Sequence, residues 1–147
     1  MTESDDKPLG FLLYRVASRL RPEVTAELQP LGLSLPQVAC MRMLSENPGL
    51  TSAELARDTP VSAQAMNRLL RSLQDLGAVT RTTTTSNQRM PAQLTKRGKA
   101  LLKRATAAAY KADRQVLAHL TQADQHQLKR LLVAAGNPAT DDADPAT

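Results

Sequence analysis

The chain has 147 residues, a formal net charge of +5 and a sequence pI of about 9.8. A single cysteine excludes an intramolecular disulfide and a Cys-x-x-Cys metal knuckle. With only three aromatic residues, stacking on unpaired bases is not expected to be the main activity. The first segment is acidic, unlike a signal peptide, and no apolar run approaches the roughly 18 residues of a membrane span. These features predict a soluble cytoplasmic protein without a membrane partner.

The positive charge is concentrated in one stretch of the chain. Residues 68–104 contain nine Lys or Arg and a single acid, Asp75, whereas six acids lie in the terminal segments 3–6 and 141–144. A basic surface kept only for solubility would not need this concentration. The pattern favours a polyanionic partner such as nucleic acid.

The N-terminal segment predicts an amphipathic helix. Its apolar residues recur in steps of three and four from Leu9 to Leu28, which places them in one stripe. Pro22 lies inside the stripe, and we expect it to kink or restart the helix. Pro30 and Gly32 are expected to end this segment.

A capping box opens the second predicted helix, over residues 35–45. The Ser34 hydroxyl accepts from the amide three residues on, and Gln37 can reach back to the cap. Thr51 and Glu54 form a second capping box before a short helix that runs to about Arg57. After a turn at Thr59-Pro60, residues 62–77 predict a fourth helix, so that residues 51–76 form a helix-turn-helix.

The fourth predicted helix has an apolar face and a polar one. Polar side chains on this face are long enough to reach base edges from the major groove. An ordinary solvated face is the alternative, but the position after the turn favours a role in recognition. The candidate DNA-binding residues on this face are Gln64, Asn67, Arg68 and Arg71, and the family resemblance given below adds Ser62.

Two short strands, expected near 78–82 and 93–95, make a hairpin directly after this helix, which is the arrangement of a wing. Arg81 at its base and Arg89 near its tip are suited to phosphates or to the minor groove. Thr95 can cap a long helix over 96–119, and Thr121 opens a last helix that stops at residues 136–138. The acidic tail, 137–147, is expected to be disordered.

The first, fifth and sixth helices are apolar but belong to no compact helix-turn-helix core. A core shared between two chains explains them most simply. The sequence thus predicts a mainly α fold in four parts. Residues 1–32 and 99–136 supply dimerisation helices, 33–98 form the winged helix-turn-helix domain, and 137–147 are the tail.

The chain resembles the MarR family of regulators over about residues 9–135. The resemblance rests on LSLPQVACMRMLSENPGLTSAELA at 33–56, PVSAQAMNRLLRSLQDLGAVTR at 60–81, LTKRG at 94–98, and the order of the elements. It implies a homodimer that represses transcription from palindromic operators in double-stranded DNA. It also implies release by a small aromatic carboxylate or another phenolic effector, with no other cofactor.

By position in the family, the effector pocket lies between the dimerisation helices and the winged domain. The residues placed there are Phe11, Tyr14, Arg15, Arg19, Cys40 and Met43. The wing departs from the family pattern, which has Asp-x-Arg a fixed distance before Leu94-Thr95. Ser86 and Gln88 stand at those positions here, and Arg89 comes one residue late.

Several other functions were weighed against this one. No Gly-rich phosphate loop and no Ser/His/Asp pattern indicates an enzyme, so no catalytic residue is expected. His119 and His126 with Asp124 are more typical of a helix surface than of a metal site. A constitutive architectural DNA-binding protein, a protein-binding winged helix, and a redox regulator acting through Cys40 remain open.

Overall fold

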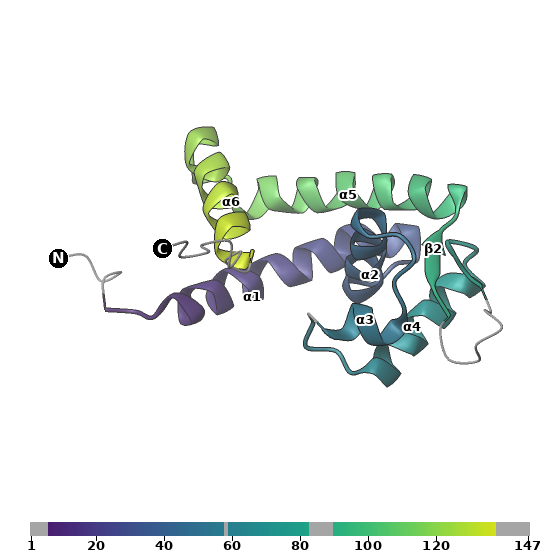
Figure 1. The fold of residues 1–147 in the computed structure, drawn as a ribbon. Coiled ribbons are helices and arrows are strands. Elements are labelled where there is room, and N and C mark those ends of the chain that lie inside the picture. The colour runs from purple at the N-terminus through teal and green to yellow at the C-terminus, as the bar shows by residue number, and fades with distance from the viewer. Residues whose placement is uncertain (1–5, 58, 83–89, 138–147) are drawn as a thin grey trace, which may run out of the picture.

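The computed structural model describes residues 6–57, 59–82 and 90–137 (Figure 1). The order of elements is α1 (Leu9–Leu28), a 3-10 turn η1 (Gln29–Leu31), α2 (Leu35–Glu46), α3 (Ser52–Arg57), α4 (Ala63–Asp75), β1 (Val79–Arg81), β2 (Ala92–Leu94), α5 (Lys96–Val116) and α6 (Gln122–Gly136). The predicted succession of helices, helix-turn-helix, hairpin, long helix and last helix is confirmed. None of the helices in the described part of the chain is both long and apolar enough to cross a membrane.

Pro22 does not restart the helix, which was one of the two effects expected of it. α1 continues through Pro22 as one helix of 20 residues. Proline removes one backbone N–H, which leaves the carbonyl of Ser18 without its helical partner. Ser18 lies on an exposed face, where water can bond that carbonyl, and the packing of Val24 and Leu28 holds the last turns in line.

The side-chain caps define where the helices begin. Ser34 and Gln37 form the complete capping box before α2. Ser62 accepts from the Ala65 amide at 3.1 Å and so opens α4. The box at Thr51 is only half formed, because the Glu54 carboxylate accepts from the Thr51 hydroxyl at 3.0 Å instead of from the backbone.

The two strands form an antiparallel pair in which Val79 lies opposite Leu94. β1 and β2 are each three residues long. Thr95 therefore does not belong to the returning strand, contrary to the prediction of a strand at 93–95. It is the N-cap of α5, which was also predicted. Its backbone N–H donates to Ala78 O at 3.0 Å, and its hydroxyl donates to Gly77 O at 2.6 Å. The hairpin and the long helix are thereby fixed to each other.

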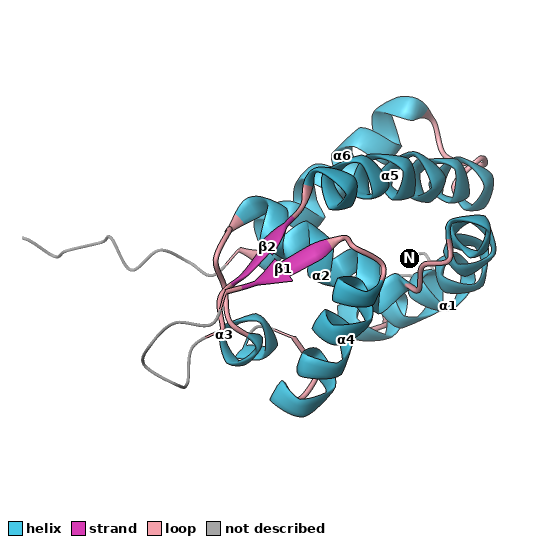
Figure 2. Ribbon diagram, turned by 90° about the vertical axis from the view of Figure 1, so that its right-hand side faces the viewer, coloured by secondary structure: helices cyan, strands magenta, loops and turns pink. Residues whose placement is uncertain are grey.

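One buried cluster connects the winged part to the long helices. It includes Leu28 of α1, Met41 of α2, Leu70 of α4 and Ala105 of α5. α1 and α5 run side by side, with α2, α3, α4 and the strands gathered at one end and α6 at the other (Figures 1 and 2). α5 ends at Val116, three residues before the expected His119, and α6 contains no buried residue in the single chain.

Candidate nucleic-acid interface

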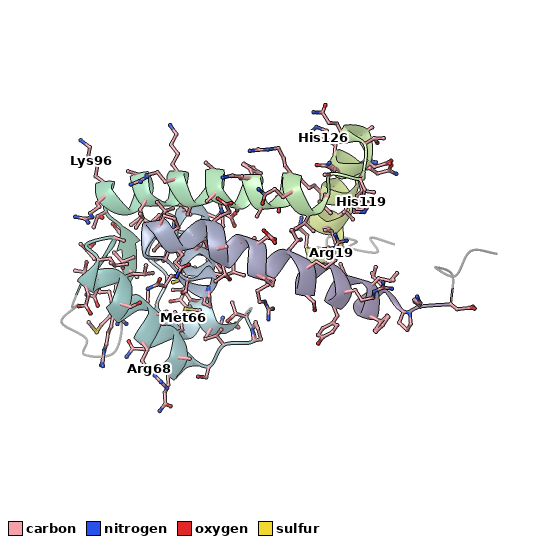
Figure 3. All side chains as sticks on the ribbon, turned by 180° about the vertical axis from the view of Figure 1, so that it is seen from behind. Arg19, Met66, Arg68, Lys96, His119 and His126 are labelled. Carbon is pink, nitrogen blue, oxygen red and sulfur yellow. The ribbon has the colours of Figure 1, made fainter. Side chains whose placement is uncertain are left out.

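α4 lies with one face in the core and the other open to solvent. Met66, Leu70 and Leu73 are at most 1% exposed, because they pack against the rest of the winged part. Arg68 and Arg71 lie on the exposed side. Figure 3 shows Arg68 pointing away from the molecule, while Met66 turns inward. α4 therefore presents cationic side chains on a convex surface, as a helix that enters the major groove must do.

Two other residues expected on this face lie at its beginning. Ser62 caps α4 through its hydroxyl oxygen, which leaves the hydroxyl proton free to donate to a phosphate. Gln64, the second residue of α4, is exposed. From both positions, contacts with phosphates can fix the register and orientation of α4 on a duplex.

Arg81 is held against α4 instead of extending from the wing. Its guanidinium Nη1 donates to Asn67 Oδ1 at 2.7 Å. Partial burial and the nearby positive charge of Arg71 lower the pKa of Arg81 from its usual value. Two arginines and one amide thus converge where α4 meets β1, and in the described part of the chain no carboxylate pairs with either arginine.

These side chains border an open recess of about 610 Å³ between α3, α4 and the strands. Gln64, Asn67 and Arg81 line it, together with Arg57 at the end of α3 and Thr51 before it. Sequence reasoning had not singled out Arg57 or Thr51 as site residues. The signal was available, since Thr51 and Arg57 lie at the two ends of the first helix of the predicted helix-turn-helix, which crosses the DNA backbone in this motif.

The expected wing arginine, Arg89, lies outside the described residues, as do Ser86, Gln88 and the acidic tail beyond residue 137. The described part of the wing is its base, namely β1 and β2. It orients Arg81 toward α4.

The six residues expected to form an effector pocket are not brought together within one chain. Cys40 is fully buried in the core of α2. Phe11 and Tyr14 are 49% and 71% exposed on the N-terminal half of α1, where Arg15 and Arg19 are also exposed. Among these six residues, Met43 lines a cavity in the described part of the chain.

That cavity measures about 570 Å³ and lies between α1, α2, the turn before α4, and α4 itself. Its lining is mostly apolar and includes Met43, Met66 and Leu69, with Arg21 as its cation. Arg21 is itself exposed, but it lies three residues before Val24 and seven before Leu28, on the same side of α1 as these buried residues. Helical phase could therefore have identified Arg21 as a residue that lines this cavity.

A second opening, of about 430 Å³, lies between α2 and α5. Arg42, Lys99 and Lys103 line it, with Tyr110 at one end. The Arg42 guanidinium donates to the hydroxyl of Thr106, which ties α2 to α5. This groove is more basic than the first and does not touch α4.

Burial raises the pKa of the Cys40 thiol to about 11, so the thiol stays protonated near neutral pH. This disfavours a redox switch at Cys40, because the thiolate is the reactive form. His119 is exposed in the turn between α5 and α6, and His126 is exposed within α6. Within the residues that the structure describes, no three His, Cys, Asp or Glu side chains cluster as a metal site would require.

Comparisons with known proteins agree with this geometry. Residues 31–90 match the model of the MarR family. The HTH-type transcriptional repressor Rv2887 of Mycobacterium tuberculosis is 56% identical over 135 residues, which are 91% of this chain and 97% of that protein. A crystal structure of the Mycobacterium tuberculosis MarR family protein Rv2887 in complex with DNA has a TM-score of 0.76 and 55% identity, covering 90% of this chain and 100% of that one.

A second crystal structure of Rv2887 from the same organism, in complex with salicylic acid, has a TM-score of 0.74. It is 56% identical and covers 90% of this chain and 98% of that one. The similarity extends over the long helices as well as the winged part. The chain belongs to the MarR family of winged helix-turn-helix transcriptional regulators.

Proposed function

We propose that this chain is a transcriptional repressor that binds a palindromic operator as a homodimer and is released by a small aromatic carboxylate. The observation that carries the proposal is the exposed cationic face of α4, which follows the turn of a helix-turn-helix. The DNA complex of the similar protein Rv2887 supports the DNA-binding part of the proposal, and its salicylic acid complex supports the effector part. Residues 33–98 would form the DNA-binding module, and 1–32 with 99–136 the dimerisation helices.

The roles of the polar residues follow from where they lie. Arg68 and Gln64 would contact base edges, because they point outward from the middle and start of α4. Ser62, Arg71 and the wing arginine Arg89 would contact phosphates and set the register. No residue is assigned a catalytic role.

Affinity for selected and random duplexes, measured over a range of salt concentrations, tests the DNA-binding half. The operator is first obtained by selecting tight-binding duplexes from a random pool. A sequence-specific repressor binds the selected duplex about a thousandfold more tightly than a random one, or better, and affinity falls steeply with salt. Equal affinity for both duplexes would instead indicate an architectural protein.

Arg68→Ala should cost about 1–3 kcal/mol of operator binding and relax the preference at one base position of each half-site. Lys96→Ala is the matched control, since Lys96 is equally exposed but lies at the start of α5 (Figure 3). If Arg68→Ala leaves both affinity and preference unchanged, α4 does not read the bases as proposed.

The cavity between α1, α2 and α4 is the proposed effector site. Its volume of about 570 Å³ lies in the usual range for small-ligand pockets, and Arg21 can pair with a carboxylate there. Met66 and Leu69 of α4 form one wall. An aromatic ring in this cavity would therefore shift α4 relative to α1, and the two recognition helices of a dimer would no longer match the groove.

Titration of a preformed operator complex with salicylate, at constant ionic strength, tests this half. Arg21→Ala should raise the salicylate concentration needed for release about tenfold, because a charge-assisted hydrogen bond is lost. Arg15→Ala and Lys103→Ala, which remove cations outside the cavity, should leave the salicylate concentration needed for release unchanged. If only Lys103→Ala raises that concentration, the effector binds in the groove between α2 and α5 instead.

A further inference from the structure

The hydrogen bond between Arg81 and Asn67 determines which end of the Asn67 amide is free to face DNA. An arginine side chain can only donate, so the atom that it meets at 2.7 Å must be the amide oxygen. The amide nitrogen, with its two N–H donors, is the end that Arg81 leaves open. The contact thus fixes the orientation of a side chain that could otherwise turn either way.

Charge reinforces this orientation. A hydrogen bond from a guanidinium is roughly twice as strong as one between neutral groups. The exocyclic amino group of adenine is a neutral donor, so it competes poorly for an oxygen that Arg81 already holds. Arg71 lies close enough to lower the pKa of Arg81, so a second cation stands near the contact between Arg81 and Asn67.

The bidentate pairing of asparagine with adenine needs both ends of the amide. Its oxygen accepts from adenine N6 while its nitrogen donates to N7. Guanine presents only acceptors, N7 and O6, along the same edge of the major groove. Arg81 occupies one of the two lone pairs of the Asn67 oxygen, so the two N–H donors are the fully open end of this amide. With cations at its side, such a site is more complementary to guanine than to adenine.

We propose that Arg81 is a specificity-positioning residue, which holds Asn67 as a donor so that α4 selects guanine over adenine at one position of each half-site. The inference rests on the proposed DNA-binding function. Arg81 acts through Asn67, while Asn67 is the group that touches the base.

Selection from a pool of random duplexes, with the full chain at one fixed ionic strength, tests the proposal. Asn67→Ala identifies the base position that residue 67 reads, because the preference there falls to within about twofold. The wild-type protein should prefer guanine to adenine at that position by about tenfold, the scale of one base-edge contact. If the wild-type protein prefers adenine there, the proposal is overturned.

Arg81→Leu frees the amide oxygen and should move the preference at that position toward adenine. Arg81→Lys keeps a charged donor and should retain guanine. Arg104→Leu removes the same charge from the exposed face of α5 and should not change any preference. A purely structural role for Arg81 would lower affinity for all duplexes alike and leave the preference unchanged, which would also overturn the proposal.

Thermal unfolding of each variant checks that it folds. If Arg81→Leu does not fold, Arg81→Gln replaces it, because glutamine is polar but lacks the charge that holds the oxygen. Its expected result is a smaller shift in the same direction. Absence of base preference at every position of the wild-type selection would refute the DNA-binding function itself, which is a different outcome from a preference for adenine.

Discussion

Asn67 and Arg68 are neighbours in sequence, but the fold gives them different surroundings. Arg68 is exposed, whereas Asn67 is partly buried and accepts a hydrogen bond from Arg81, 14 residues later in the chain. Helical phase places both residues on the polar side of α4. The difference arises because β1 returns along α4 and brings Arg81 within hydrogen-bonding distance of Asn67, so that Asn67 is restrained.

Cys40 provides a test of stability at the scale of one residue. Its pKa is about 11 in the folded chain, against 9.0 for a solvated thiol. The folded state therefore favours the protonated thiol, and this contribution is complete below pH 9 and lost as pH rises through about 11. The free energy of unfolding should fall by up to about 2–3 kcal/mol over that range from this group.

Denaturant unfolding of the wild-type protein and of Cys40→Ala, from pH 8 to pH 11, measures this contribution. Lysine and tyrosine also titrate in the range, so the difference between the two proteins is the informative quantity. Cys40→Ala should be less stable than the wild-type protein at pH 8, because it leaves a cavity. The stability gap should narrow with rising pH, and a constant gap would mean that the thiol ionises normally in the folded chain.

At the scale of the element, Gly98 shows why the LTKRG segment at 94–98 has its particular residues. A Cβ atom at position 98 would lie 2.0 Å from Ala78 O and 2.9 Å from Ala78 C. Both are backbone atoms and cannot rotate away. The first turn of α5 packs directly on the chain that enters β1, and only glycine permits this approach.

Gly98→Ala should therefore destabilise the protein by about 1–3 kcal/mol, as overpacking in a rigid site does. Gly10→Ala is the matched control: Gly10 is also in a helix, but its Cβ would meet nothing within 4 Å. Alanine normally favours a helix over glycine, so the control should be neutral or slightly stabilising. Chemical denaturation gives the free energy of unfolding of the two variants. If Gly98→Ala is as stable as Gly10→Ala, the junction between β1 and α5 can relax to accept the methyl group.

The elements differ in how well local sequence predicts them. The starts of α2, α4, α5 and α6 follow from Ser34, Ser62, Thr95 and Thr121, because a capping side chain acts within three residues. A restart at Pro22 does not occur, because its local cost is outweighed by packing of α1 against the rest of the chain. The cavity that Met43 and Arg21 line could not be predicted, because it is formed by four segments distant in sequence, which no local pattern describes.

At the scale of the whole molecule, the two ends of the long helices carry apolar surface that the single chain does not cover. Exposed side chains include Leu9, Phe11 and Tyr14 on α1, and Leu131 and Val133 on α6. A patch of this kind is unusual on a monomer and typical of an interface between subunits. The predicted homodimer would cover it.

Light scattering at micromolar concentration should give about twice the chain mass of 15.9 kDa. Leu131→Glu should shift the mass toward that of one chain, because it places a charge in the apolar surface. Glu46→Gln, an exposed change at the end of α2, is the control and should leave the mass unchanged. A mass near 16 kDa for the wild-type protein would refute the dimer.

The rigidity of the dimer can be tested on the DNA itself. α5 has 21 residues and so spans about 31 Å, and it is fixed to the hairpin through Thr95 and to α2 through Arg42. The winged parts are therefore held at a set distance by helices and not by a flexible linker. Two recognition helices held in this way match half-sites about one turn of DNA apart, roughly 10 bp.

Inserting five base pairs at the centre of the operator turns one half-site to the opposite face, and affinity should fall at least about a hundredfold toward the level of random duplex. Inserting ten restores the face but adds about 34 Å between the half-sites. Rigid arms cannot span that distance, so affinity should stay low with ten inserted pairs as well. Recovery with ten, measured by fluorescence anisotropy under identical salt conditions, would mean that the winged parts move independently, and an effector that shifts α4 by a few ångströms could then not account for release.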